Sequence, residues 1–135
     1  MNTTKLTKFD KLCMKSELMQ VNLLAQQTYL EEHGEPMYCG FAWVDVPVTR
    51  TNSKEAKMLS EWGFKKSWIP KTMQFWIAQK VGDYGQSMDI KIAGAKAMVE
   101  KLEQHGIKAT YRCRADYQWR LLWNIFLIYL QLSVL

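Results

Sequence analysis

Basic and aromatic side chains gather in two stretches of the sequence that contain no acidic residue. Residues 62–82 hold four lysines together with Trp68, and residues 104–115 hold one lysine and two arginines. Cations that neutralise phosphates, placed beside a ring that stacks on a base, are what a single-stranded nucleic-acid site requires. Provided that the two stretches lie side by side, we predict one nucleic-acid-binding patch made of Lys65, Lys66, Trp68, Lys71, Arg112 and Arg114.

The same residues also have simpler interpretations. Trp68 can pack on the core within a solvated, lysine-rich loop. Arg112 and Arg114 can be the charges of an exposed edge strand, where they block pairing with other chains. With Asp116 they can also form a strand end that binds an anion or takes part in catalysis. The sequence leaves these alternatives open.

A second candidate for anion binding is Ser87, which lies in the segment Gln86-Ser87-Met88 before a predicted helix. Backbone N–H groups at a helix N-terminus, with the Ser87 hydroxyl as an added donor, can bind an anion. The alternative is an ordinary N-cap, which stabilises a fold by about 1 kcal/mol. We favour the N-cap because no glycine-rich phosphate loop is present.

Catalytic and metal chemistry has little support in the sequence. No G-x-S-x-G, H-E-x-x-H or Walker segment is present. The cysteines and histidines lack the spacing of zinc ligands. Four aspartates could meet as they do in metal-dependent nucleases, but their spacing predicts no meeting: Asp45, Asp83, Asp89 and Asp116. We therefore predict no catalytic residue, no metal and no cofactor, and we assign Trp43, Trp62 and Trp76 to the core.

Length and composition indicate one globular domain. The chain has 135 residues, of which 48% are hydrophobic and 23% charged. Its net charge is +5, and the positive excess falls in residues 38–116, which favours an anionic partner although many basic proteins bind none. Three cysteines without close spacing predict free thiols in a reducing compartment. Residues 1–20 lack the apolar region of a signal peptide.

The elements that must position these residues follow an alternating pattern. Helices are expected over residues 9–33, 53–62 and 87–105, and strands over 38–46, 73–79 and 107–114, with a further strand over 64–69. The pattern predicts an α/β fold in a single domain, with a small three- to four-stranded sheet packed by two or three helices.

Three details of this fold can be predicted. The first helix is expected to bury a stripe made of Phe9, Leu12, Met19, Leu23 and Leu30. Helical crossovers favour parallel neighbouring strands, whereas a hairpin through Pro70-Lys71 makes the sheet mixed. Strand 107–114 alternates between apolar and basic residues, which is typical of a half-buried edge strand.

The C-terminal segment differs from the rest of the chain. Residues 119–135 are apolar apart from Arg120, Asn124, Gln131 and Ser133. The run is shorter than the roughly 20 apolar residues of a membrane span. A helix docked on the domain, a membrane anchor and a frame-shifted extension all remain open. We divide the chain into an N-terminal helix (1–36), an α/β domain (37–116) and an apolar tail (117–135).

Several short segments together resemble one family. They are Cys39–Val44, Asn52–Lys54 with Ala56, Trp76-Ile77, Gln86–Met88, Gly106–Ala109 and Arg114–Asp116. Over about residues 37–116 the chain is similar to a family of small proteins of tailed bacteriophages and prophages for which no activity is assigned. The resemblance implies expression in the cytoplasm of an infected bacterium. The chain departs from the family at Ile69–Thr72, where the family has a Gly-Gly turn, and in the tail after Asp116.

These observations lead to a functional prediction with alternatives. We expect a non-catalytic binding protein that acts in the host cytoplasm on nucleic acid or a nucleoprotein. The alternatives are a binder or inhibitor of a host protein, and a small metal-dependent hydrolase or nuclease. Membrane contact through residues 119–135 is a lesser alternative, and the oligomeric state is left open.

Overall fold

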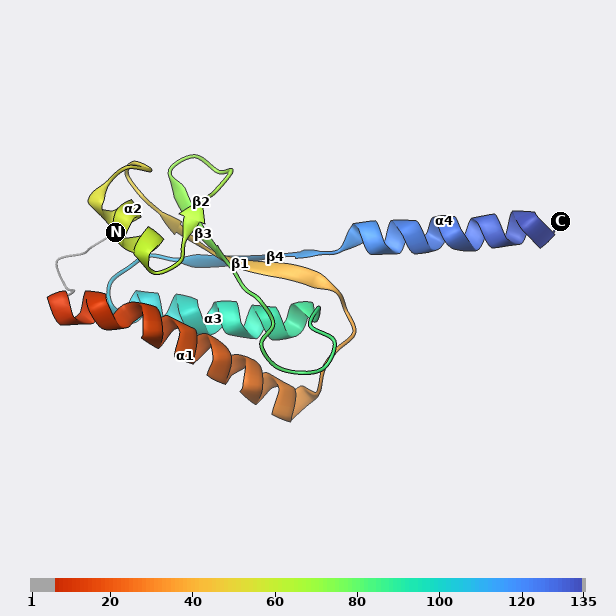
Figure 1. Cartoon of the computed structure of the whole chain (residues 1–135), viewed down its shortest axis with the longest axis horizontal. Helices are drawn as coiled ribbons and strands as arrows, with labels where there is room; N and C mark the ends of the chain where they lie inside the picture. Colours follow the sequence, from red (N-terminus) through yellow and green to blue (C-terminus); the bar gives the residue numbers. More distant parts are fainter. Residues whose placement is uncertain (1–6, 135) are drawn as a thin grey trace.

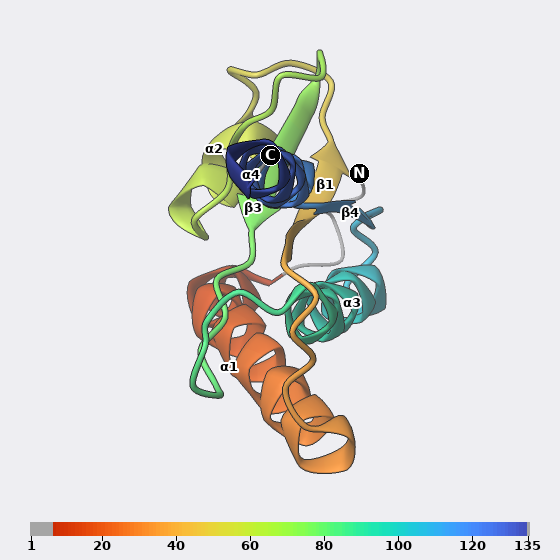
Figure 2. The ribbon, with the colours of Figure 1, turned by 90° about the vertical axis from the view of Figure 1, so that its right-hand side faces the viewer.

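The computed structural model describes residues 7–134, of which residues 117–124 and 134 are described by their backbone alone. The element order is α1 (Lys8–His33), β1 (Gly40–Pro47), α2 (Lys54–Glu61), β2 (Lys65–Lys66), β3 (Thr72–Trp76), α3 (Met88–Gln104), β4 (Thr110–Ala115) and α4 (Tyr117–Val134). The sheet lies on a layer formed by α1 and α3 (Figures 1 and 2). The predicted α/β class is confirmed.

The four strands form one sheet in the order β2-β3-β1-β4, and every neighbouring pair is antiparallel. The hairpin through Pro70-Lys71 is present, but the sheet has neither the parallel neighbours nor the mixed strand directions that the two alternatives predicted. Each helical crossover does join two strands that run in the same direction, β1 to β2 and β3 to β4. Another strand lies between the members of each pair, because β2 and β3 form a hairpin. This β-α-β-β-α-β order is the split βαβ arrangement of ferredoxin-like folds.

One face of the sheet is covered by the helices. Ala42, Val44 and Val46 of β1 are buried on this face, with Met73 of β3. α3 lies under β1 and β4, and α1 packs along α3. The core cluster draws on α1, β1, β3 and α3, on Ile107 and Ala109 just before β4, and on α2 through Ala56 and Leu59. Because alternate residues of a strand point to opposite faces, the odd-numbered residues of β1 lie on the other face.

α1 begins as a capped helix but buries a different stripe from the predicted one. Thr7 and Asp10 form a reciprocal capping box. The buried residues of α1 are Met14, Leu18, Asn22 and Gln26, whereas the predicted residues Phe9, Leu12, Met19 and Leu23 are exposed. The expected stripe is therefore wrong in its orientation, and the helix turns two amides into the interior.

Gln26 explains why amides occupy this face. Its Nε2 donates to Asn22 Oδ1 (2.8 Å) and to the carbonyl of Ala78 (3.1 Å), and its Oε1 accepts from the N–H of Lys80 (2.8 Å). These bonds satisfy a buried side chain and hold the segment after β3 against α1. The partners are far away in sequence, so helical periodicity alone cannot reveal them.

Gly40 lies where β1, β4 and α3 come together. A Cβ at this position would lie 2.6 Å from Met88 Sδ and 2.7 Å from the Arg114 carbonyl oxygen. A glycine is therefore needed at the start of β1, because backbone and side-chain atoms fill the space. Lys91 Nζ donates to the Gly40 carbonyl (3.0 Å), so α3 is also tied to this end of the strand.

α4 runs away from the rest of the molecule instead of packing on its own domain (Figure 1). Its large apolar side chains between residues 125 and 132 are exposed by 42–70%. The alternative of a helix docked on its own domain therefore does not hold. Within the part of the chain that the structure describes, no helix combines the length and apolar content needed to cross a membrane.

Candidate nucleic-acid interface

The open face of the sheet is defined by strand register. Trp43 of β1 lies opposite Trp76 of β3 and Arg112 of β4, and Phe41 lies opposite Arg114. Paired residues of neighbouring strands point to the same face. We call the set on this side the open face: Lys65, Thr72, Gln74, Trp76, Phe41, Trp43, Asp45, Thr110, Arg112 and Arg114.

Three aromatic rings form the centre of the open face. The Trp43 and Trp76 rings are stacked, with 4.6 Å between centroids and 25° between planes. Phe41 meets Trp76 edge-on, with 5.9 Å between centroids and 73° between planes. Trp43 is 6% exposed and Trp76 is 42% exposed. Trp43 therefore supports Trp76 from within, while Trp76 presents its ring to solvent.

Two arginines border the aromatic rings on β4. Arg114 lies over the Phe41 ring, 5.5 Å from guanidinium carbon to centroid, a cation–π distance. Arg112 forms an ion pair with Asp45, with 3.2 Å between Nε and Oδ2, and half of its side chain is exposed. Cationic groups and an exposed ring thus lie on adjacent strands of one surface.

Asp45 is a buried carboxyl within this surface. Burial raises its pKa, and the Arg112 charge opposes the rise. The Trp43 indole N–H also favours the charged form, although its geometry falls short of a hydrogen bond. Asp45 Oδ1, Trp43 Nε1 and Gln74 Oε1 are buried without hydrogen-bond partners. A buried polar atom without a hydrogen bond lowers the stability of the fold. Three of them at the centre of the open face therefore need an explanation other than the packing of the sheet.

The structure places the predicted patch residues at two opposite edges of the sheet. Lys65 and Lys66 are on β2, and Arg112 and Arg114 are on β4, with β3 and β1 between them. The side-by-side arrangement on which the single patch depended is therefore not present. Lys65 shares the open face with the arginines, but Lys66 lies opposite the buried Met73 and points to the covered side.

Trp68 and Lys71 belong to the loop of the β2-β3 hairpin. Trp68 is 77% exposed, so the interpretation that it packs on the core is wrong. Lys71 has a positive φ of 55°, which closes the hairpin in a conformation uncommon for a side-chain-bearing residue. Neither residue is in the strand register that defines the open face.

Sequence reasoning missed the aromatic centre, although the signal was present. Trp43, Trp62 and Trp76 were all assigned to the core, and Trp43 and Trp62 are indeed buried. Trp76 is 42% exposed, because its pairing with Trp43 places it on the open face, which no helix in the described part of the chain covers. The signal was the run Phe41-Ala42-Trp43-Val44, which is apolar on both faces of one strand. Such a run predicts cover on both sides, whereas the second face is here a layer of aromatic rings.

Ser87 lies at the N-cap position of α3, but its side chain makes no capping hydrogen bond. Its hydroxyl is buried without a partner. The Ser87 N–H donates to Gln79 Oε1 (2.7 Å), and the Met88 N–H donates to the Tyr38 carbonyl (2.8 Å). These bonds use two of the backbone donors that an anion would need. Ser87 therefore occupies the predicted N-cap position of α3, but its hydroxyl does not form the hydrogen bond expected of an N-cap residue.

The loop before α3 holds a carboxylate of the chain itself. The Glu35 carboxylate accepts hydrogen bonds from the N–H groups of Asp83, Tyr84 and Gly85 (2.8, 3.0 and 3.4 Å) and from Gln79 Nε2 (2.5 Å). Partial burial raises the pKa of Glu35, but these donors outweigh it and the pKa is lowered. This ring of donors is an anion site filled from within the molecule.

The distribution of metal-binding side chains adds no further site. Among the residues that the structure describes, no three His, Cys, Asp or Glu side chains come close enough to hold a metal ion. The convergence of acids that a metal-dependent hydrolase would need is thus not seen in that part of the chain. Comparisons with protein-family models, curated proteins and solved structures found no match.

Proposed function

We propose that the protein is a non-catalytic binder of single-stranded nucleic acid, and that the open face is its binding surface. The observation that carries the proposal is the half-exposed Trp76 ring, stacked on Trp43 at the centre of a four-stranded antiparallel sheet. Single-stranded RNA-binding modules with such a sheet stack bases on aromatic side chains of its central strands. This is an argument by analogy of architecture, so the site chemistry must support it independently.

The charges around the rings supply that support. Arg112 and Arg114 border the rings on β4, and Lys65 lies on the opposite edge strand of the same face. A single strand whose base stacks on Trp76 would have its backbone within reach of cations on either side. Duplex DNA has no exposed base face, so this surface favours single strands.

The family resemblance supplies a setting for this activity. It implies that the protein is made in the cytoplasm of an infected bacterium, where single-stranded nucleic acid or a nucleoprotein would be the target. An acidic host protein is the alternative partner for the same cations. It would not need the exposed Trp76 ring, which is why we favour nucleic acid.

The test is a titration of a labelled twelve-nucleotide single strand at several salt concentrations, with the matching duplex in parallel. Lys65→Ser combined with Arg114→Ser should reduce the slope of log K against log salt by about 1.4, since each contact to a single strand contributes roughly 0.7. Arg112 is left in place because its replacement would leave the buried Asp45 carboxylate without its ion-pair partner. The matched control is Lys54→Ser with Lys57→Ser on α2, which removes the same charge away from the open face.

The proposal is supported if the single-stranded oligonucleotide binds and if the slope of log K against log salt falls only in the variant with Lys65→Ser and Arg114→Ser. It is overturned if the wild-type protein binds no DNA or RNA at low salt, where electrostatic affinity is greatest. Equal loss of slope in both double variants would also overturn it, because the effect would then follow net charge instead of the open face.

A further inference from the structure

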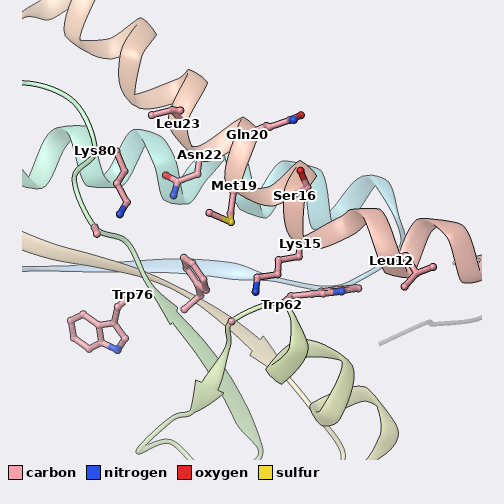
Figure 3. A pocket seen from close by; sticks show the side chains of 13 residues that line it. Leu12, Lys15, Ser16, Met19, Gln20, Asn22, Leu23, Trp62, Trp76 and Lys80 are labelled. Atoms are coloured by element: carbon pink, nitrogen blue, oxygen red, sulfur yellow. The ribbon is translucent and has the colours of Figure 1, made fainter.

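An apolar groove runs between α1 and the ends of α2 and β3 (Figure 3). Its volume is about 850 Å³. The α1 side between Leu12 and Leu23 forms one wall, and the other includes Trp62, Phe75, Trp76, Ala78 and Lys80, so that Trp76 of the open face also lines the groove. Lys15 and Met19 extend from α1 into the space between the two walls, and Lys15 approaches Trp62 (Figure 3).

The α1 wall is the apolar stripe that does not enter the core. Of the apolar residues in this wall, Leu12 is 75% exposed, and Met19 and Leu23 are about half exposed. Single exposed apolar side chains need no explanation, but three of them along one groove, beside Trp62 and Phe75, indicate a binding surface. The groove therefore needs an apolar occupant.

α4 carries a second exposed apolar surface. Seven large apolar side chains lie between residues 125 and 132, each about half exposed or more: Ile125, Phe126, Leu127, Ile128, Tyr129, Leu130 and Leu132. Residues 125–134 contain no charged residue. A helix that is apolar all round is stable in water only when another surface covers it.

α4 is held so that it points away from the groove of its own chain. Asp116 alone separates β4 from α4. Its N–H donates to the Cys39 carbonyl (3.1 Å), which ties this junction to the segment before β1. Figures 1 and 2 show α4 continuing outward from that point. In this arrangement α4 does not cover the groove of its own chain, whereas a second copy can bring its groove to the exposed helix.

We propose that two copies of the chain form a dimer by exchanging α4, each helix lying in the α1 groove of the other copy. Such an exchange covers both apolar surfaces in a closed two-fold arrangement. Half-exposed side chains of this size offer on the order of 80 Å² each, and about four of them can face one groove. Two reciprocal contacts, counting both surfaces of each, would bury on the order of 1,300 Å² in total, which lies within the range of specific interfaces.

The experiment measures the mass of the full-length chain in solution by light scattering. Leu23→Glu places a charge in the groove, and Ile128→Glu places one on α4. Leu24→Glu is the matched control, since Leu24 is the next residue of α1, is exposed, and does not line the groove. We expect the wild type and Leu24→Glu to be dimers and the other two variants to be monomers. Met19→Glu replaces Leu23→Glu if that variant fails to fold, as judged by circular dichroism.

Mixing the two monomeric variants separates exchange from other modes of association. An equimolar mixture retains one intact contact, between the α4 of the Leu23→Glu chain and the groove of the Ile128→Glu chain. Exchange therefore predicts that a dimer returns in the mixture. The proposal is overturned if the wild type is a monomer. It is also overturned if Leu23→Glu stays dimeric or the mixture stays monomeric, because α4 would then pair with something other than the groove.

Discussion

The two faces of the β-sheet are built from alternate residues of the same strands, yet they differ in chemistry. On the covered face, Val44 and Val46 are fully buried against the helices. On the open face, Trp43 and Asp45 are also buried, but beneath Trp76 and Arg112 instead of beneath a helix. The comparison teaches that burial alone does not identify the core, because one face is closed by aliphatic packing and the other by its own rings and charges.

The largest effect is expected on the covered face. Val44→Asp would bury a charge with no partner, at a cost of several kcal/mol, or about the whole stability of a small domain. The chain should lose cooperative unfolding in a thermal melt. Thr110→Lys also adds a charge, but at an exposed open-face position opposite Asp45, and it should change the free energy of unfolding by about 0.5 kcal/mol or less. A folded Val44→Asp chain would contradict this assignment of the faces.

Trp76→Ala tests the open face directly. Removing the exposed ring should weaken binding to a single strand by about 1–3 kcal/mol, while the salt dependence stays nearly unchanged. Fluorescence anisotropy of a labelled oligonucleotide measures both quantities. Trp68→Ala is the informative companion, because Trp68 is exposed on the hairpin loop. A greater loss from Trp68→Ala than from Trp76→Ala would move the stacking site from the open face to that loop.

Asp45→Asn tests the charge that lies beneath Arg112. Because burial raises the pKa of Asp45 above 3.8 in the folded chain, the folded state binds more protons than the unfolded state between 3.8 and the raised value. The wild type should therefore lose stability as pH rises through that window. The variant should not share this loss, and at neutral pH it should lie within about 1 kcal/mol of the wild type. Urea unfolding at several pH values measures the difference, and a fall in wild-type stability relative to the variant on acidification would have the wrong sign.

The smallest effect distinguishes two adjacent lysines. Lys65 lies on the open face and Lys66 on the opposite side. Lys65→Ser should reduce the salt slope of single-strand binding by about 0.7, whereas Lys66→Ser should leave it unchanged. The two variants have equal net charge, so each serves as the control for the other. Equal salt slopes in the two variants would show that β2 does not contact the bound oligonucleotide.

Local features of the sequence were sufficient to predict most of the elements. The Thr7 cap, the Ser53 cap and the glycines after α1, α2 and α3 mark where the helices begin and end. Each of these signals acts within a few residues, so neighbouring side chains carry the information. The alternation in residues 107–114 correctly placed Arg112 and Arg114 away from the core. Their grouping with Lys65 and Lys66 in one patch could not be tested locally.

Tertiary structure decided which surfaces those elements bury and which they expose. The orientation of α1 depends on Gln26, whose partners Ala78 and Lys80 lie more than fifty residues away. The open face depends on β3 entering between β1 and β2, which brings Trp76 onto Trp43. Both outcomes are set by contacts between distant segments, and such contacts leave no periodic trace in either segment. The sequence by itself therefore determined the helices, the strands and the positive charge, while the fold decided where an aromatic surface and an apolar groove would face solvent.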